Sequence, residues 1–287
     1  MTSAVLKKSY VLAAALVAAA LVFAAPLSAA TAKKKKPRAK KPRAAQTRKA
    51  EPPPVPRPPD PNRVTIRSAD GVRLAATWRP NPARSDAPAL LLVHDFARER
   101  REWTALADEL ASLGFATLAL DLRGHGESTQ QDGKPNVRPS PTLLRSPSGF
   151  PRDVEAACAW LRERAPAVGV LGVSVGGSLA LLATASSWAD AAVAVSVNTD
   201  KLPFLAGGRP THAKGTLVLA TEKDPGRKAS AEEIHSAAEE PKGMKLYPGA
   251  AHNFALFTAH PDAKQLAFAW LTARLTASPA EAPGGTP

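Results

Sequence analysis

The sequence predicts an α/β domain built on a mostly parallel, doubly wound sheet, with an N-terminal antiparallel hairpin and no large cap domain. Short continuous apolar runs such as "ALLLV" and "VGVLGV" alternate with longer segments of helical periodicity. This pattern is typical of strands buried on both faces of a parallel sheet. Before them, at 63–80, two segments of alternating polarity flank the turn "ADG", which predicts the hairpin.

The remaining elements follow in chain order, with apolar runs predicting strands and apolar residues at helical spacing predicting helices. We expect strands in "ALLLVHD", "FATLALD", "VGVLGV", "AAVAVSV", "GTLVLAT" and "MKLYPG", and helices in "REWTALADELASLG", "RDVEAACAWLRERA", "GGSLALLATAS", "AEEIHSAAEE" and "DAKQLAFAWLTARL". In the first helix, apolar residues lie at helical spacing and Gly114 is a stop signal; these residues are Trp103, Leu106, Leu110 and Leu113. Ligands of such sheets bind beyond the carboxyl ends of the strands, so polar residues there are the candidates for function.

Residues 1–30 resemble an export signal. Two lysines precede the apolar run "VLAAALVAAALVF", a proline follows it, and "LSAA" offers small residues for cleavage before Thr31. We therefore expect a periplasmic or secreted protein. The alternative is an inner-membrane anchor through residues 11–30, which are nearly long enough to span a bilayer.

Residues 31–61 form a basic, proline-rich linker that cannot bury a core and is expected to be disordered. Residues 1–60 hold 13 of the 38 Lys and Arg but only two of the 25 acids, so most of the net charge of +13 lies outside the folded part. The linker is either a solvated spacer or a segment that adheres to an anionic envelope surface. No specific nucleic-acid partner is expected. The folded domain is assigned to 62–277 and a disordered tail to 278–287.

A serine interrupts "VGVLGVSVGGSLALLATA" where a buried strand gives way to a helix. Ser174 lies in Gly172-Val173-Ser174-Val175-Gly176, and a nucleophile on so sharp a turn needs glycine two positions before and after it. The start of the following helix also favours negative charge. The alternative is a small residue that merely fills a tight turn, because a bare G-x-S-x-G match is a weak signal. The strand before it and the small-residue helix after it favour a displayed nucleophile.

Two further strand ends offer a base and an acid. His252 in "YPGAAHNF" follows the last predicted strand, and a serine hydroxyl becomes a good nucleophile only when such a base can take its proton. Asp224 in "LVLATEKDPGR" follows the preceding strand, where an acid would hold the imidazole in the correct tautomer. The alternatives are a surface histidine, a solvated turn aspartate, and Asp200 as the rival acid.

Together with "LLLVHDF" and "ALDLRGHGES", these residues make the chain resemble the α/β-hydrolase superfamily, especially its small serine esterases and dienelactone-hydrolase-like members. The resemblance implies a triad of Ser174, His252 and Asp224. It also implies an oxyanion hole formed by the backbone N–H groups of Val175 and Phe96, and no metal or organic cofactor. The matched positions are His94-Asp95-Phe96, residues 121–128, the serine turn, Asp224 and His252.

Two departures from that family pattern bear on function. The family usually has glycine where Asp95 stands, and a carboxylate there would oppose the negative charge of the reaction intermediate. Either Asp95 points away, where Arg98 or Arg100 could pair with it, or the oxyanion hole is altered. Many dienelactone hydrolases have cysteine at the nucleophile position, so Ser174 favours ordinary ester hydrolysis. The single cysteine, Cys158, is expected to be a small core residue.

These residues predict a serine hydrolase that cleaves carboxylic esters through an acyl-enzyme. Only 17 residues, 198–214, separate two of the predicted strands, too few for a folded lid, so a small-molecule ester with a short or exposed acyl group is expected as substrate. The segment 129–149 is expected to wall the pocket. The alternative, which Asp95 favours, is a catalytically weak hydrolase-fold module that binds the cell envelope through its basic tail.

Overall fold

The computed structural model describes residues 59–96, 98–132, 149–199 and 212–276. By internal contacts the chain divides into two compact units, Met1–Pro56 and Arg57–Pro287, and all described residues belong to the second. The export signal at 1–30, nearly all of the linker at 31–61 and the C-terminal tail lie outside the described residues, and these assignments stay predictions. Within the described ranges, no helix is both long and apolar enough to cross a membrane.

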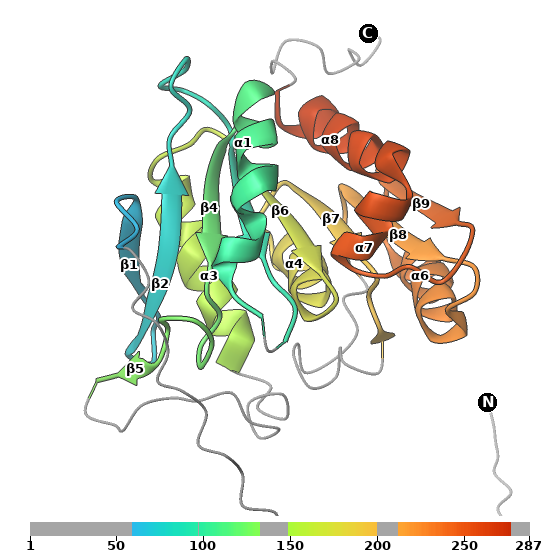
Figure 1. Ribbon diagram of the computed structural model, residues 1–287, viewed down its shortest axis with the longest axis horizontal. Coiled ribbons are helices and arrows are strands. Elements are labelled where there is room, and N and C mark those ends of the chain that lie inside the picture. Colours follow the sequence, from blue (N-terminus) through green and yellow to red (C-terminus); the bar gives the residue numbers. More distant parts are fainter. Residues whose placement is uncertain (1–58, 97, 133–148, 200–211, 277–287) are drawn as a thin grey trace, which may run out of the picture. The chain divides into compact units, whose positions relative to one another are not determined.

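Nine strands of the described chain form one sheet in the order β1-β2-β4-β3-β6-β7-β8-β9, with β5 paired to β2 (Figure 1). β2 pairs antiparallel with β1, β4 and β5, and every pair from β4 to β9 along the sheet is parallel. This confirms the predicted fold class. The strands are β1 Arg63–Arg67, β2 Val72–Arg79, β3 Ala89–Val93, β4 Ala116–Leu120, β5 Gln130–Gln131, β6 Val168–Val173, β7 Ala191–Val195, β8 Thr216–Thr221 and β9 Lys242–Tyr247.

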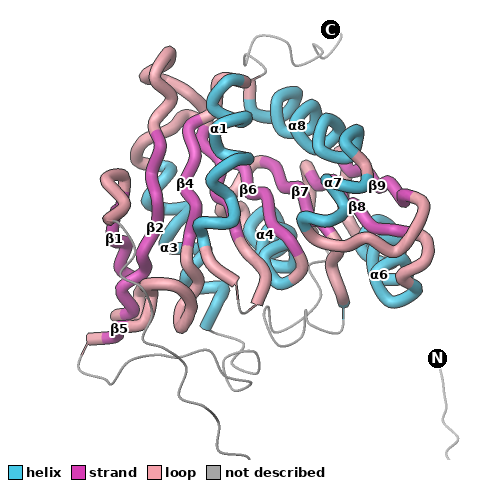
Figure 2. The backbone as a smooth tube through the Cα atoms, viewed as in Figure 1, coloured by secondary structure: helices cyan, strands magenta, loops and turns pink. Residues whose placement is uncertain are grey.

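Helices cover both faces of this sheet (Figures 1 and 2). They are η1 Arg100–Trp103, α1 Thr104–Ser112, α3 Gly149–Arg162, α4 Val175–Ala185, α6 Pro225–Ala237, α7 Phe254–Ala259 and α8 Pro261–Leu275. Successive side chains of a strand point to opposite faces, and β3 shows the result. Leu91 packs in the cluster that contains α3 and α4, whereas Leu90 and Leu92 pack with α1, α7 and α8.

The apolar runs form strands because each can bury both faces. All residues of β3, β4, β6, β7 and β8 are buried, as expected for the interior of a parallel sheet. One apolar residue of the predicted helical spacing does not lie in the core. Leu113 lies just beyond the last residue of α1, where the helical spacing no longer applies, and it is 45% exposed.

Cys158 is a core residue, as predicted. It lies on the buried face of α3 and is 1% exposed. Burial raises the pKa of its thiol to about 12, because the thiolate would lose its hydration there.

The carboxyl ends of the parallel strands share one edge of the sheet, and a buried ion pair fixes the loop that follows β4 there. Asp153 of α3 is fully buried and accepts three hydrogen bonds from Arg123, one from its backbone N–H at 2.8 Å and two from its guanidinium at 2.8 and 2.9 Å. Asp70, in the hairpin turn, accepts from the same guanidinium at 2.7 and 3.0 Å. Arg123 therefore joins the hairpin, the loop and α3.

We expect Asp153→Ala to lower the free energy of unfolding by about 3 kcal/mol, because it leaves the Arg123 guanidinium buried with fewer partners. Chemical denaturation followed by circular dichroism measures this change. The matched control is Asp86→Ala, which removes an exposed partner of Arg84 and should cost less than about 1 kcal/mol. Equal effects of the two variants would show that the buried pair does not stabilise the fold.

Candidate active site

Ser174 stands on a strained turn between β6 and α4. Its backbone has φ 50° and ψ −111°, a region that costs a non-glycine residue of order 1–3 kcal/mol. The turn is fixed to the neighbouring strand, since the Ser174 N–H donates to the Val195 carbonyl at 2.8 Å. Strain maintained by its surroundings is characteristic of functional positions.

The two glycines of the motif are required by close backbone contacts. A Cβ on Gly172 would lie 2.1 Å from the Gly176 carbonyl oxygen, and a Cβ on Gly176 would lie 2.1 Å from the carbonyl oxygen of Val93 in β3. No side chain fits at either distance. The sequence motif therefore has the steric cause that was inferred for it.

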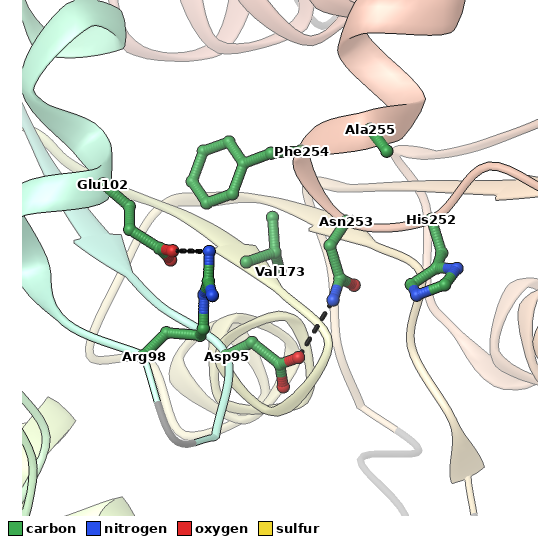
Figure 3. A pocket seen from close by; sticks show the side chains of 8 residues that line it. All are labelled: Asp95, Arg98, Glu102, Val173, His252, Asn253, Phe254 and Ala255. Atoms are coloured by element: carbon green, nitrogen blue, oxygen red, sulfur yellow. Dashed lines mark hydrogen bonds and ion pairs between the residues drawn. The ribbon is translucent and has the colours of Figure 1, made fainter. Parts of the chain in front are cut away.

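His252 lies in the loop after β9 and is exposed to solvent. Within the described residues its ring makes no hydrogen bond. It lines a pocket of about 310 Å³ together with Val173, the residue before Ser174 (Figure 3). The other lining residues are Asp95, Arg98, Glu102, Asn253, Phe254 and Ala255.

Two other histidines near this edge are committed to structural hydrogen bonds. His94 donates from Nδ1 to the Asp95 carbonyl at 2.6 Å and accepts at Nε2 from the Leu122 N–H at 3.0 Å. Burial lowers the pKa of His94 to about 3, which keeps the ring neutral. His125 donates from Nδ1 to the Arg123 carbonyl at 2.9 Å, and burial lowers its pKa as well. Neither ring is placed to act as a solvent-exposed base.

Asp224 is the N-cap residue of α6. Its Oδ1 accepts from the Arg227 N–H at 3.2 Å, and its Oδ2 forms an ion pair with the Arg227 guanidinium. Burial raises the pKa of the Asp224 carboxyl, but the hydrogen bonds and charge of Arg227, with a smaller effect of His252, outweigh it and leave that pKa below its ordinary value. The carboxylate is thus ionised and held by Arg227, and within the described residues no hydrogen bond joins it to the His252 ring.

Asp95 does not pair with Arg98 or Arg100. Arg98 pairs with Glu102, and Arg100 pairs with carboxylates that include Asp121. Asp95 Oδ1 instead accepts from the Phe96 N–H at 2.7 Å. The Phe96 N–H, one of the two implied oxyanion donors, is therefore already engaged by the Asp95 carboxylate.

The other implied donor, Val175, is the first residue of α4. The first N–H groups of a helix have no partner within the helix, so this group can donate a hydrogen bond to a ligand oxygen. No group of three or more His, Cys, Asp or Glu in the described ranges could hold a metal ion. The rival acid Asp200 and residues 133–148 of the expected pocket wall lie outside the described residues.

Sequence reasoning missed two residues that shape this site. Arg227 lies three residues after Asp224 and forms an ion pair with it. The i,i+3 spacing of the two residues on a helix could have indicated this contact. Asn253 binds Asp95 across 158 residues of sequence. The only indication of this role in the sequence was that Asn253 directly follows His252.

Comparison with solved structures identifies the architecture. The described domain matches an esterase from Pyrococcus furiosus, Pf2001, with a TM-score of 0.57 and 18% identity over 74% of this chain and 90% of that one. It matches a dienelactone hydrolase from Anabaena variabilis with a TM-score of 0.56 and 22% identity over 74% and 97% of the two chains. The chain has the α/β-hydrolase fold. This confirms the fold that the sequence motifs implied.

Two more comparisons agree with this fold. A third structure, Est1E from Butyrivibrio proteoclasticus with ferulic acid bound, matches with a TM-score of 0.59 and 14% identity over 75% of this chain and all of that one. A family model described as serine aminopeptidase, S33, matches residues 85–199, which include the Ser174 turn. Comparison with curated protein sequences finds no significant match.

We expect Gly176→Ala to destabilise this α/β-hydrolase domain by about 1–3 kcal/mol, because the added methyl group would force the start of α4 away from β3. The midpoint of chemical denaturation measures the change. Gly226→Ala in α6 is the matched control, since its nearest new contact is Asp224 Oδ1 at 3.9 Å. If Gly176→Ala unfolded at the same midpoint as the control, the close approach would not be a constraint on the fold.

Proposed function

We propose that this protein is a serine hydrolase that cleaves carboxylic esters, with Ser174 as nucleophile, His252 as base and Asp224 as the acid that orients it. The conformation of Ser174 carries the proposal, because a strained backbone at φ 50° directly before the N-terminus of α4 is the arrangement that a displayed nucleophile requires. The esterases among the structural neighbours support ester hydrolysis as the reaction.

The first half of the reaction forms the acyl-enzyme. Ser174 Oγ attacks the ester carbonyl carbon while His252 takes the hydroxyl proton. When the tetrahedral intermediate collapses, the bond to the alkoxy oxygen breaks and His252 gives the proton to the departing alcohol. In the second half, a water molecule that loses its proton to His252 attacks the acyl carbon. Ser174 then leaves with that proton, and the carboxylic acid is released.

The intermediate carries a negative oxygen that needs hydrogen-bond donors, each of which contributes on the order of 3 kcal/mol. Val175 supplies one N–H from the start of α4. Phe96 supplies the second only when the Asp95 carboxylate releases it. We therefore propose that Asp95 slows the reaction relative to a glycine at this position.

The pocket beside His252 bears on the size of the substrate. Its volume of about 310 Å³ is near the lower limit for small-molecule sites, which supports a short acyl group or one that extends into solvent. The proposal also includes export through residues 1–30 and adhesion to an anionic envelope surface through residues 31–61.

The engaged Phe96 N–H favours a second candidate, a hydrolase-fold module that binds a ligand and turns over slowly. The two candidates differ in rate rather than in fold. A short-chain neutral ester assay on the full chain separates them, because the slow module would turn over only slightly faster than a Ser174 variant.

We expect Ser174→Ala to lower turnover on a short-chain neutral ester by on the order of a thousand-fold or more, because the nucleophile is removed while binding remains. A fluorophosphonate probe should label the wild-type chain at Ser174, and the variant should not be labelled. Ser186→Ala, an exposed serine at the end of α4, is the control and should behave as wild type. Labelling that survives Ser174→Ala would place the nucleophile elsewhere.

We expect Asp224→Asn to lower turnover by on the order of 10⁴-fold with little loss of stability, because an asparagine no longer selects the imidazole tautomer that can accept the serine proton. The fold should survive, since an amide oxygen can still accept from the Arg227 N–H. Asp200→Asn tests the rival acid under the same conditions, with circular dichroism spectra recorded for both variants. A larger loss in Asp200→Asn would show that Asp200 is the acid.

A further inference from the structure

Asn253 has an unusual conformation for a residue next to a proposed catalytic base. It follows His252, precedes α7 and has φ 54° and ψ −133°. Asparagine occupies positive φ more readily than most residues, yet the conformation is uncommon and must be maintained by contacts.

Two hydrogen bonds maintain it, and they lead to two different strands. The Asn253 N–H donates to Ser196 Oγ at 2.9 Å, and Ser196 directly follows β7. The side-chain Nδ2 donates to Asp95 Oδ2 at 2.9 Å, in the loop after β3 (Figure 3). β3 and β7 are the two neighbours of β6 in the sheet. Asn253 therefore bridges the strands on both sides of β6, the strand that ends directly before Ser174.

Both anchors of this bridge are themselves fixed. Ser196 is 1% exposed, donates its N–H to the Leu219 carbonyl at 2.8 Å and accepts at its carbonyl from Arg227 Nε at 3.1 Å. Asp95 is tied through Oδ1 to the Phe96 N–H. The ring of His252 has no hydrogen bond of its own within the described chain, so its place depends on the backbone beside it.

We propose that Asn253 is a positioning residue that holds His252 over Ser174 and links the base to the oxyanion loop. The proposal rests on the hydrolase function given above. When a substrate oxygen accepts the hydrogen bond of the Phe96 N–H, the Asp95 carboxylate loses that donor. It still accepts the hydrogen bond from the Asn253 side-chain amide. The same side chain that steadies the base thus determines where the Asp95 carboxylate lies while the intermediate forms.

A swap of the two side chains tests this link. The substitution Asn253→Asp places two carboxylates against each other, and aspartate tolerates the positive φ of this position. It should lower kcat on a short-chain neutral ester by about 10- to 100-fold, as expected for loss of a hydrogen bond to a charged group. KM should change little. In the double variant Asp95→Asn with Asn253→Asp, the donor and acceptor are exchanged and the pair forms again. We expect its kcat to recover most of that loss.

Amide hydrogen exchange of residues 248–256 supplies a readout that does not depend on turnover. Exchange should be faster in Asn253→Asp than in wild type and should slow again in the double variant. Asn81→Ala is the structural control. Asn81 caps backbone carbonyls of Ala111 and Phe115 at 2.8 and 3.2 Å, so its loss should lower stability while kcat and exchange at 248–256 stay at wild-type values.

The outcomes separate this proposal from the function it rests on. If the wild-type chain cleaves the ester but Asn253→Asp keeps wild-type kcat, or the swap restores neither kcat nor exchange, Asn253 does not position the base. If the wild-type chain cleaves no ester, the proposed function fails, and the exchange experiment alone decides whether Asn253 anchors the loop. Unchanged exchange in Asn253→Asp would overturn the proposal in that case too.

Discussion

The geometry of the site depends on one close approach between main chains. The first turn of α4 lies so near the end of β3 that Gly176 has no room for a Cβ beside the Val93 carbonyl. Packing at this distance sets where α4 begins, and Ser174 takes a positive φ directly before its first residue. The turn is not stable by local preference. Two buried strands and a buried helix fix its ends, and the residue between them has no freedom to relax.

Buried arginines fix the loops that surround the Ser174 turn. Arg100 donates its backbone N–H to Asp121 Oδ1 at 2.7 Å and forms an ion pair with the same carboxylate. Glu127 donates its N–H to that carboxylate at 2.9 Å. Charges removed from water are costly unless they are fully paired, and here the pairing is nearly complete. Much of the motif "DLRGHGES" therefore serves to shape a loop rather than to contact a substrate.

The sequence predicted those parts of the site that depend on local patterns. Buried strands are visible as continuous apolar runs, and the Ser174 turn is visible because its steric requirement falls on residues two positions away. α7 was not predicted because six residues are too few to establish a period, and β5 has only two. The partner of Asp95 could not be predicted, because nothing near Asp95 in the sequence indicates a contact with a residue 158 positions later.

Asp224 shows the same limit in a milder form. Its position after a strand was readable, and the structure places it at the N-cap of α6, directly beyond the loop that follows β8. Asp224 pairs with Arg227 because α6 already begins at Pro225. The helix expected from the sequence pattern begins several residues later. A boundary misplaced by one or two turns was enough to hide the ion pair.

The deeply buried thiol of Cys158 has a practical consequence. With a pKa near 12 and almost no exposed surface, it should not react with maleimides or iodoacetamide while the domain is folded, because the thiolate is the reactive form. A cysteine introduced on the surface would then be the sole reactive thiol. Spin labels or fluorophores could be attached at chosen positions around the pocket without first removing the native residue, and the distances between loops could be followed in solution.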